Sequence, residues 1–272
     1  MENIDWNKLW QDSRAKRSWQ PKTQADWDQR AAGFAKRNIR SPYVLGFLDK
    51  AVVAPKETVL DVGAGPGTLA IPLAARAKAV TAIDFSSQML NILQERMAEQ
   101  GVTNIQTIEA SWDDDWQAKG IKQHDLVVAS RSLAVKDLKK ALEKLNTFAR
   151  KRVIIGDRVG CGPFDPAIFE AIGRSFEPGP DYIYTVNILY QMGIKARVDF
   201  IRSGGASIYS SRQEALAAWR WMLQDLSVEE EARYVSHMDS RLHQTAAESW
   251  QLKDQVQPRW AVIQWKTEEN DS

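Results

Sequence analysis

Short apolar runs rich in β-branched residues alternate along the middle of the chain with longer segments in which apolar residues recur every three or four positions. The short runs have the length of buried strands, and the longer segments are typical of amphipathic helices. The strands predicted in this region are residues 58–62, 79–83, 105–108, 125–129 and 152–155. The helices predicted between them are residues 68–77, 86–99 and 136–149. This alternation predicts a parallel sheet with helices on both faces.

The two ends of the chain have a mainly helical pattern. Residues 1–50 carry four tryptophans, and helices are predicted over residues 23–34 and from the Ser41-Pro42 pair through Leu48. After the alternating region, the predicted helices are residues 166–175 and 182–192, followed by two that begin at the capping boxes Ser211/Glu214 and Ser227/Glu230 and run to about residues 223 and 243. Two further strands are predicted at residues 197–201 and 260–265. The segment between them is far longer than a hairpin needs.

The composition argues against several classes of protein. The chain has 272 residues with 36 Lys and Arg against 35 Asp and Glu, a net charge of +1. Such a balance argues against a protein held to nucleic acid mainly by phosphate neutralisation. The single cysteine, Cys161, cannot form an intrachain disulfide, which favours a reducing cytoplasm. We expect neither a signal peptide nor a membrane helix, because no apolar run approaches about 18 residues.

The segment Glu57–Leu73, ETVLDVGAGPGTLAIPL, carries the most specific chemical signal. A predicted strand contains Asp61 near its end and breaks into a glycine-rich turn before a helix. This arrangement lets backbone N–H groups and a helix N-terminus approach a ligand closely. A second acid, Asp84, ends the next strand about 20 residues further on, where a carboxylate can accept hydrogen bonds from ribose hydroxyls. The sequence therefore predicts an adenosine-binding site.

The glycine spacing separates the candidate adenosine ligands. A dinucleotide turn has the pattern G-x-G-x-x-G because a pyrophosphate must lie on the helix end. Here the pattern is G-x-G-x-G, and Asp61 suits a ligand with an ammonium group better than one with phosphates. The run Val59–Gly67, VLDVGAGPG, together with the acid-ended strand Val80–Asp84, resembles the first two motifs of the class I S-adenosylmethionine-dependent methyltransferases. An NAD-type site and a glycine turn without a ligand are the alternatives.

The resemblance covers residues 55–157 well and the rest only in outline. It implies an α/β fold with a Rossmann-like, seven-stranded, mostly parallel sheet, helices on both faces and a helical cap. The last two strands would be an antiparallel pair. The implied cofactor is S-adenosyl-L-methionine, with S-adenosyl-L-homocysteine as product. We expect three parts: residues 1–50 as an N-terminal helical cap segment, 51–160 as the cofactor-binding core, and 161–272 completing the sheet with helical cap insertions.

The resemblance also implies where the cofactor is bound, at the carboxyl edge of the sheet. Asp61 would hold the methionine ammonium, Asp84 the ribose hydroxyls, and Phe85 would cover the adenine face. The full predicted set is Asp61, Gly63, Ala64, Gly65, Asp84, Phe85, Ser111, Trp112 and Ser130. The run Asp113–Asp115 is interpreted as a solvated acidic loop, because three consecutive carboxylates cannot all face one ion. We expect no metal site, since the three histidines are badly spaced for zinc.

The acceptor side of the site is less defined by the sequence. Arg131, after the fourth strand, is positioned to bind an acceptor carboxylate bidentately or to pair with a local acid. Tyr43 and Tyr190, from the aromatic cap segments, are further candidates. The chain lacks the D/N-P-P-Y/F pattern of base-N-methylating enzymes, and Cys161 is better explained as a small residue in a turn than as a nucleophile.

These observations predict a methyltransferase that acts on a small-molecule acceptor by direct in-line methyl transfer. No catalytic residue is identified. An RNA or protein methyltransferase and a non-catalytic cofactor-binding protein are the alternatives. We expect no nucleic-acid or membrane partner, and the sequence makes no prediction about oligomeric state or acceptor atom.

Overall fold

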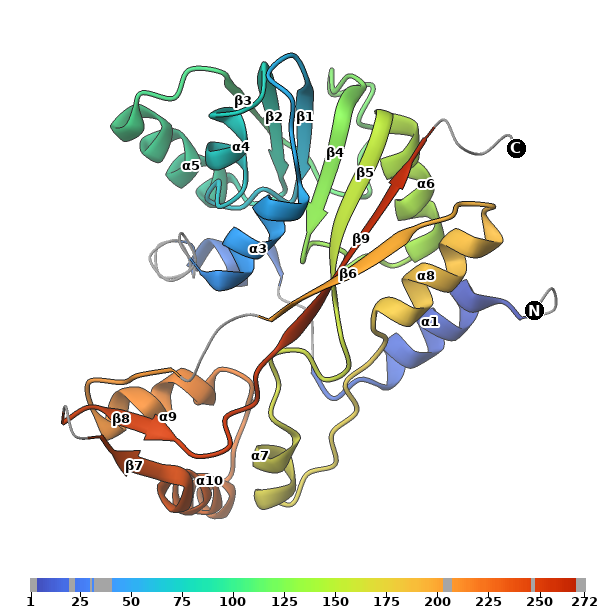
Figure 1. Ribbon diagram of the computed structural model, residues 1–272. Coiled ribbons are helices and arrows are strands. Elements are labelled where there is room, and N and C mark those ends of the chain that lie inside the picture. The colour runs from blue at the N-terminus through green and yellow to red at the C-terminus, as the bar shows by residue number, and fades with distance from the viewer. Residues whose placement is uncertain are drawn as a thin grey trace.

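The computed structural model describes residues 4–19, 23–29, 31, 41–202, 207–245 and 248–267. Seven strands form one sheet in the order β3-β2-β1-β4-β5-β9-β6 (Figure 1). Their bounds are β1 Thr58–Val62, β2 Ala79–Asp84, β3 Ile105–Glu109, β4 His124–Ser130, β5 Ala149–Arg158, β6 Arg197–Arg202 and β9 Arg259–Lys266. The first five are parallel, and β9 runs antiparallel to both β5 and β6. The predicted fold class and the antiparallel final pair are confirmed.

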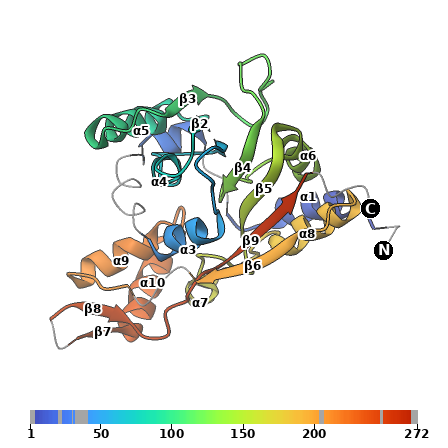
Figure 2. The same ribbon diagram turned by 45° about the horizontal axis from the view of Figure 1, so that its top comes forward.

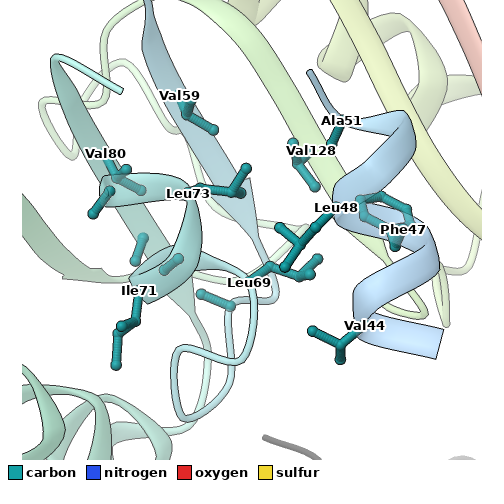
Figure 3. Close-up of a cluster of buried hydrophobic side chains, with 14 of the residues drawn as sticks. Val44, Phe47, Leu48, Ala51, Val59, Leu69, Ile71, Leu73, Val80 and Val128 are labelled. Carbon is teal, nitrogen blue, oxygen red and sulfur yellow. The ribbon is translucent and has the colours of Figure 1, made fainter. Parts of the chain in front are cut away.

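Helices cover both faces of this sheet. Their bounds are α1 Trp6–Lys16, α3 Pro42–Lys50, α4 Ala70–Ala74, α5 Ser87–Gln100, α6 Leu138–Phe148, α7 Pro166–Ala171, α8 Tyr182–Gln191, α9 Arg212–Arg220 and α10 Val228–Arg241. One buried cluster joins α3, α4 and α5 to one face of the sheet, and a second joins α1, α6 and α8 to the other. Figure 3 shows the first cluster, in which Phe47 and Leu48 of α3 lie beside Val128 of β4. Among the described residues, no helix has the length and apolar character that a membrane crossing requires.

The segment between β6 and β9 folds as a separate lobe. It contains α9, α10 and a short antiparallel pair, β7 Leu242–Gln244 with β8 Trp250–Leu252. Together with α7 it forms a third buried cluster. Figures 1 and 2 both place this lobe beyond the carboxyl ends of β4 and β5. Two ion pairs tie it to the chain after β5: Arg241 with Asp165 at 2.7 Å, and Arg174 with Glu230 at 2.6 Å.

Several predicted helices are shorter than expected, for local reasons. The helix predicted over residues 68–77 is confined to α4, because turns occupy the residues just before it. The helix predicted over 166–175 ends at Ala171, shortly before Gly173, whose φ of 83° is left-handed. The one predicted over 136–149 starts at Leu138, with Asp137 as its N-cap. Of the helix predicted over 23–34, residues 24–29 and 31 are helical, and residues 32–34 lie outside the described residues.

The two predicted capping boxes differ in the structure. At Ser227 both hydrogen bonds of the box with Glu230 are present. At Ser211 the side chain accepts from the Glu214 N–H, but the Glu214 carboxylate accepts from the N–H and hydroxyl of Ser210 instead. The predicted box at Ser211 is therefore incomplete, because Glu214 bonds to Ser210, one residue earlier, instead of to the Ser211 backbone.

Candidate cofactor and acceptor site

The end of β1 places a carboxylate in a buried position. Asp61 is 2% exposed, and its Oδ2 has no hydrogen-bond partner among the described residues. Burial, reinforced by the nearby carboxylate of Asp84, raises the pKa of Asp61 to about 7. An unpaired buried carboxylate is costly, and a cation beside it offsets that cost. The end of β1 therefore fits a positively charged group of a ligand.

The glycine turn after β1 shows which of its glycines leave room for a ligand. Gly63, Gly65 and Gly67 have φ values of 72°, 54° and 77°, all left-handed. A side chain at Gly63 would collide with Ser132, and one at Gly67 would collide with Leu93. A Cβ atom at Gly65 would meet nothing within 4 Å. Packing thus explains the outer two glycines, and Gly65 is the one at which a ligand can approach the backbone.

The N–H groups of this turn are mostly committed within the protein. Those of Gly63 and Ala64 both donate to the Ile83 carbonyl, at 2.8 and 3.0 Å. That of Gly65 donates to the Asp84 carboxylate at 2.8 Å. Of the predicted residues, Gly63 and Ala64 therefore shape the turn with their backbones, and Gly65 contributes close approach.

Asp84 ends β2 and ties two loops together. It is 6% exposed, and its carboxylate accepts from the N–H groups of Gly65 and Ser86, the latter at 2.9 Å. Burial is the main cause that raises the pKa of this carboxyl. Each carboxylate oxygen can accept a second hydrogen bond, so both remain able to accept from hydroxyls. The Ser86 hydroxyl donates to Asp28, which brings the helical residues 24–29 against this edge. Asp28 was not predicted, because nothing in the local pattern relates it to residue 86.

The loop after β3 is held by its own hydrogen bonds. The Ser111 N–H donates to the Asp114 carboxylate at 2.7 Å, so this N–H is not free to bind a ligand. The Trp112 indole donates to the Ser132 carbonyl at 2.9 Å and thereby joins this loop to the one after β4. Phe85 and Trp112 are both half-buried. The carboxylates of the acidic loop have separate partners, such as Lys119 for Asp114 and Lys136 for Asp113.

The end of β4 carries the cationic candidate. Arg131 has a φ of 56°, which is uncommon for a residue with a side chain. Its guanidinium lies over two aromatic rings, 4.3 Å from the ring centre of Tyr43 and 5.6 Å from that of Trp260. No carboxylate pairs with it in the part of the chain that is described. The residue is exposed, and desolvation by the surrounding protein lowers the pKa of its guanidinium.

Tyr43 supports Arg131 from below. It is 1% exposed, and its hydroxyl lies 2.6 Å from the Ser130 hydroxyl. Gly156 of the neighbouring strand has no room for a side chain, because the Tyr43 hydroxyl occupies that space. Tyr43 is therefore too buried to contact a ligand directly, and its ring packs against Arg131. Tyr190 is 67% exposed near the end of α8, and no contact among the described residues joins its side chain to Arg131 or to the glycine turn.

Comparison with known proteins agrees with this geometry. A family model described as a methyltransferase domain matches residues 59–152. An uncharacterized protein of Haemophilus influenzae is 35% identical over 245 residues, 89% of each chain. Two shorter matches are a probable ribosomal RNA small subunit methyltransferase A of Methanosphaera stadtmanae, 35% identical over 30% of this chain and 29% of that one, and a ubiquinone biosynthesis O-methyltransferase of Paracidovorax citrulli, 37% identical over 26% and 30%.

Solved structures show the same fold. A putative methyltransferase from Bacillus halodurans superposes with a TM-score of 0.56 at 11% identity, over 82% of this chain and 98% of that one. A SAM-dependent methyltransferase from Aquifex aeolicus gives a TM-score of 0.51 at 14% identity, over 90% and 99%. With this fold and the acid–glycine–acid arrangement in place, the chain carries a methyltransferase domain over residues 59–152, in the fold that S-adenosylmethionine-dependent methyltransferases share.

Proposed function

We propose that this enzyme transfers the methyl group of S-adenosylmethionine directly to a small-molecule acceptor. The donor supplies an electrophilic methyl group on a sulfonium. The observation that carries the cofactor half of the proposal is the unpartnered buried oxygen of Asp61 beside the open backbone at Gly65. Asp61 fits the ammonium of the methionine portion, directly or through water, and the free lone pairs of Asp84 fit the ribose hydroxyls.

The remaining predicted cofactor residues have supporting roles in this proposal. Phe85 directly follows Asp84 and is half-buried, so it is placed to cover one face of the adenine. Trp112 is fixed by its bond to the Ser132 carbonyl and closes the same side. Ser111 can contribute its hydroxyl rather than its N–H, which Asp114 already occupies. Ser130 acts through Tyr43, with which its hydroxyl is paired.

Arg131 supports an acceptor that carries a carboxylate. Asp61 of β1 is in register with Val128 of β4, so the end of β4 follows directly beside the proposed ammonium site. The Arg131 guanidinium lies over two aromatic rings and pairs with no carboxylate among the described residues, so it is suited to bind a carboxylate on a substrate. The chain's role in such a reaction is to orient the acceptor and to exclude water, and orientation alone contributes roughly 7–11 kcal/mol to catalysis.

Two features favour a small molecule over RNA. The net charge of +1 provides little general attraction for a phosphate backbone. The relatives named for ribosomal RNA or ubiquinone chemistry match between 23% and 38% of this chain, so their acceptors do not carry over to it. We further propose that residues 1–50 and 161–272 cover the cofactor core and form the acceptor side. We keep the cytoplasm as the proposed location, on the ground of the single cysteine.

The direct test is methyl transfer from isotopically labelled S-adenosylmethionine to fractionated metabolite pools, ribosomal RNA and protein extract in parallel. We expect label in a low-molecular-weight fraction with the wild-type enzyme, and much less with Arg131→Gln. Label found only in RNA or protein would contradict the small-molecule proposal. Calorimetric titration with S-adenosylmethionine, S-adenosylhomocysteine and NAD accompanies it, because an enzyme that binds the first two and labels no fraction would be a non-catalytic cofactor-binding protein.

A further inference from the structure

Three arginines gather beside the carboxyl edge: Arg17 and Arg158 lie over Trp19, and Arg14, which lies over Trp10, is close enough to Arg17 to act on it through its charge. Arg14 lies in the last turn of α1, Arg17 caps that helix, and Arg158 ends β5. The guanidinium carbons of Arg17 and Arg158 lie 4.7 and 5.4 Å from the ring centre of Trp19. Trp19 is itself fixed, because its indole donates to the Pro178 carbonyl at 2.9 Å. The cluster is therefore a defined part of the fold.

None of these arginines forms an ion pair with a carboxylate among the described residues. Burial, and then the positive charges of Arg14 and Arg158, lower the pKa of Arg17 to about 10, and burial alone lowers that of Arg14. Two buried nitrogens, Nε of Arg14 and one terminal nitrogen of Arg158, have no hydrogen-bond partner in the part of the chain that the structure describes. The polar contacts recorded for the other nitrogens are carbonyls: Trp19 at 3.0 Å from Arg17, and Pro180 at 2.5 Å from Arg158.

The acids closest to this cluster are already engaged. Asp157 and Asp181 act on Arg158 through their charge, but neither forms an ion pair with it among the described residues. The Asp157 carboxylate accepts from the Thr185 hydroxyl at 2.6 Å and from the Arg158 N–H. Asp181 caps α8 and accepts from the Gly160 N–H. Like charges held together in this way cost free energy, and a bound anion would offset that cost.

A surface pocket of about 260 Å³ adjoins the cluster. Its lining residues are Gln11, Arg14, Ala15, Arg17 and Lys136. Lys136 follows β4 in the same loop as Arg131, and its ion pair with Asp113 is exposed to solvent. The pocket thus joins α1 to the loop after β4, and three of its five lining residues are cationic.

We propose that this pocket binds a carboxylate or phosphate group of the methyl acceptor, at a second anchoring point beyond Arg131. The attribution to the acceptor rests on the proposed function, whereas the anion site itself does not. Two strand spacings of about 4.8 Å separate β5 from β1, and Arg158 lies four residues beyond the position level with Asp61, so the end of β5 is roughly 16 Å from Asp61 and the proposed cofactor site. A polyanionic small molecule that reaches both Arg131 and this pocket would be oriented across the donor.

The test uses the full chain at low ionic strength and two probes, citrate and inorganic phosphate, in calorimetric titrations. The variants are Arg14→Gln and Arg17→Gln. The control is Arg76→Gln, which removes the same charge from an exposed turn between α4 and β2. We expect at least one probe to bind, with affinity about tenfold or more weaker in each cluster variant and within about twofold of wild type in the control, as loss of a charge-assisted bond implies. The stronger probe then identifies the anion.

Two outcomes would overturn the anion site. One is that neither probe binds, including the case in which a single-stranded RNA binds tightly through these arginines. The other is that Arg76→Gln loses as much affinity for the probe as the cluster variants do. Thermal melting of each variant reports folding, and Arg14→Gln serves if Arg17→Gln disturbs the packing on Trp19. Binding of S-adenosylhomocysteine is measured separately. If the anions bind and S-adenosylhomocysteine does not, the anion site is supported and the proposed function is not. If S-adenosylhomocysteine binds and the anions do not, the cofactor half of the proposed function stands and the anion site is wrong.

Discussion

Asp61 is a buried acid whose charge is disfavoured until a ligand arrives. Its pKa in the folded protein is about 7, above the usual value of 3.8 in an unfolded chain. Protonation therefore favours the folded state. The stability associated with the neutral carboxyl is fully present below about pH 4 and is lost as the pH rises through about 7.

We expect Asp61→Asn to be more stable than the wild type at pH 8, by up to about 4 kcal/mol, and nearly equal to it at pH 4, because the pKa rises from 3.8 to about 7 and each unit corresponds to about 1.4 kcal/mol. Chemical denaturation at the two pH values measures this difference. The ammonium group of S-adenosylhomocysteine binds the ionised carboxylate, so the affinity of the wild type for this ligand should fall as the pH is lowered from 7.5 to 5.5. The Asp61→Asn variant should bind weakly at both pH values. A difference in stability that does not change with pH would contradict the assignment.

Asp84 combines a structural and a binding role at one side chain. We expect Asp84→Asn to weaken binding of S-adenosylhomocysteine by roughly 1–3 kcal/mol, because ribose hydroxyls lose a charged acceptor. The amide can accept only one of the two N–H bonds from Gly65 and Ser86, so stability should also fall by about 1–2 kcal/mol. Calorimetry and denaturation measure the two effects. Asp113→Asn, at an exposed carboxylate, is the control, and an affinity equal to the control's would leave Asp84 with a structural role alone.

At the scale of elements, the lobe between β6 and β9 depends on a buried ion pair. The Asp165 and Arg241 side chains are 3% and 14% exposed and join the start of α7 to the end of α10. We expect Asp165→Asn to destabilise the lobe by about 1–3 kcal/mol, because it leaves a partly buried arginine without its charge partner. Hydrogen exchange should accelerate in α7 and α10 and stay unchanged in β1 and β4, which belong to other clusters.

The matched control for this pair is the exposed ion pair of Arg212 with Asp239 on the same lobe. Asp239→Asn should cost less than about 1 kcal/mol, since solvent screens exposed pairs. If both variants lose the same stability, or if the sheet exchanges faster together with the lobe, the lobe is not an independent cooperative unit.

At the scale of the whole molecule, cofactor binding should raise the free energy of unfolding, because the ligand binds only the folded chain. S-adenosylhomocysteine at about 100 times its dissociation constant should stabilise the folded state by about 2.7 kcal/mol. For a chain of this size that corresponds to a rise in melting temperature of roughly 5–10 °C. Differential scanning calorimetry measures it, with NAD at the same concentration as the control. A shift with NAD and none with S-adenosylhomocysteine would overturn the cofactor assignment.

The sequence alone was enough to locate the sheet core. Strands β1, β2 and β4 fall within a residue of their predicted limits, because a parallel strand buried on both faces must be a continuous apolar run. The Ser41 and Ser86 caps mark the starts of α3 and α5 for an equally local reason, a hydroxyl that accepts from the first turn. The short strands β7 and β8 were missed, since three residues carry no periodicity.

Some residues of the candidate site could be predicted from the sequence, and others could be found only from the tertiary structure. Asp61, Gly65 and Asp84 follow from the sequence, because turn geometry and a strand-end acid are encoded within one strand–turn–helix unit. The tertiary structure alone decided that Tyr43 packs against Arg131, that Tyr190 is exposed at the end of α8, and that Arg158 meets Arg17 over Trp19. Those contacts join residues that are far apart in the chain, so they depend on how the helices pack against the sheet, and no local pattern records that packing.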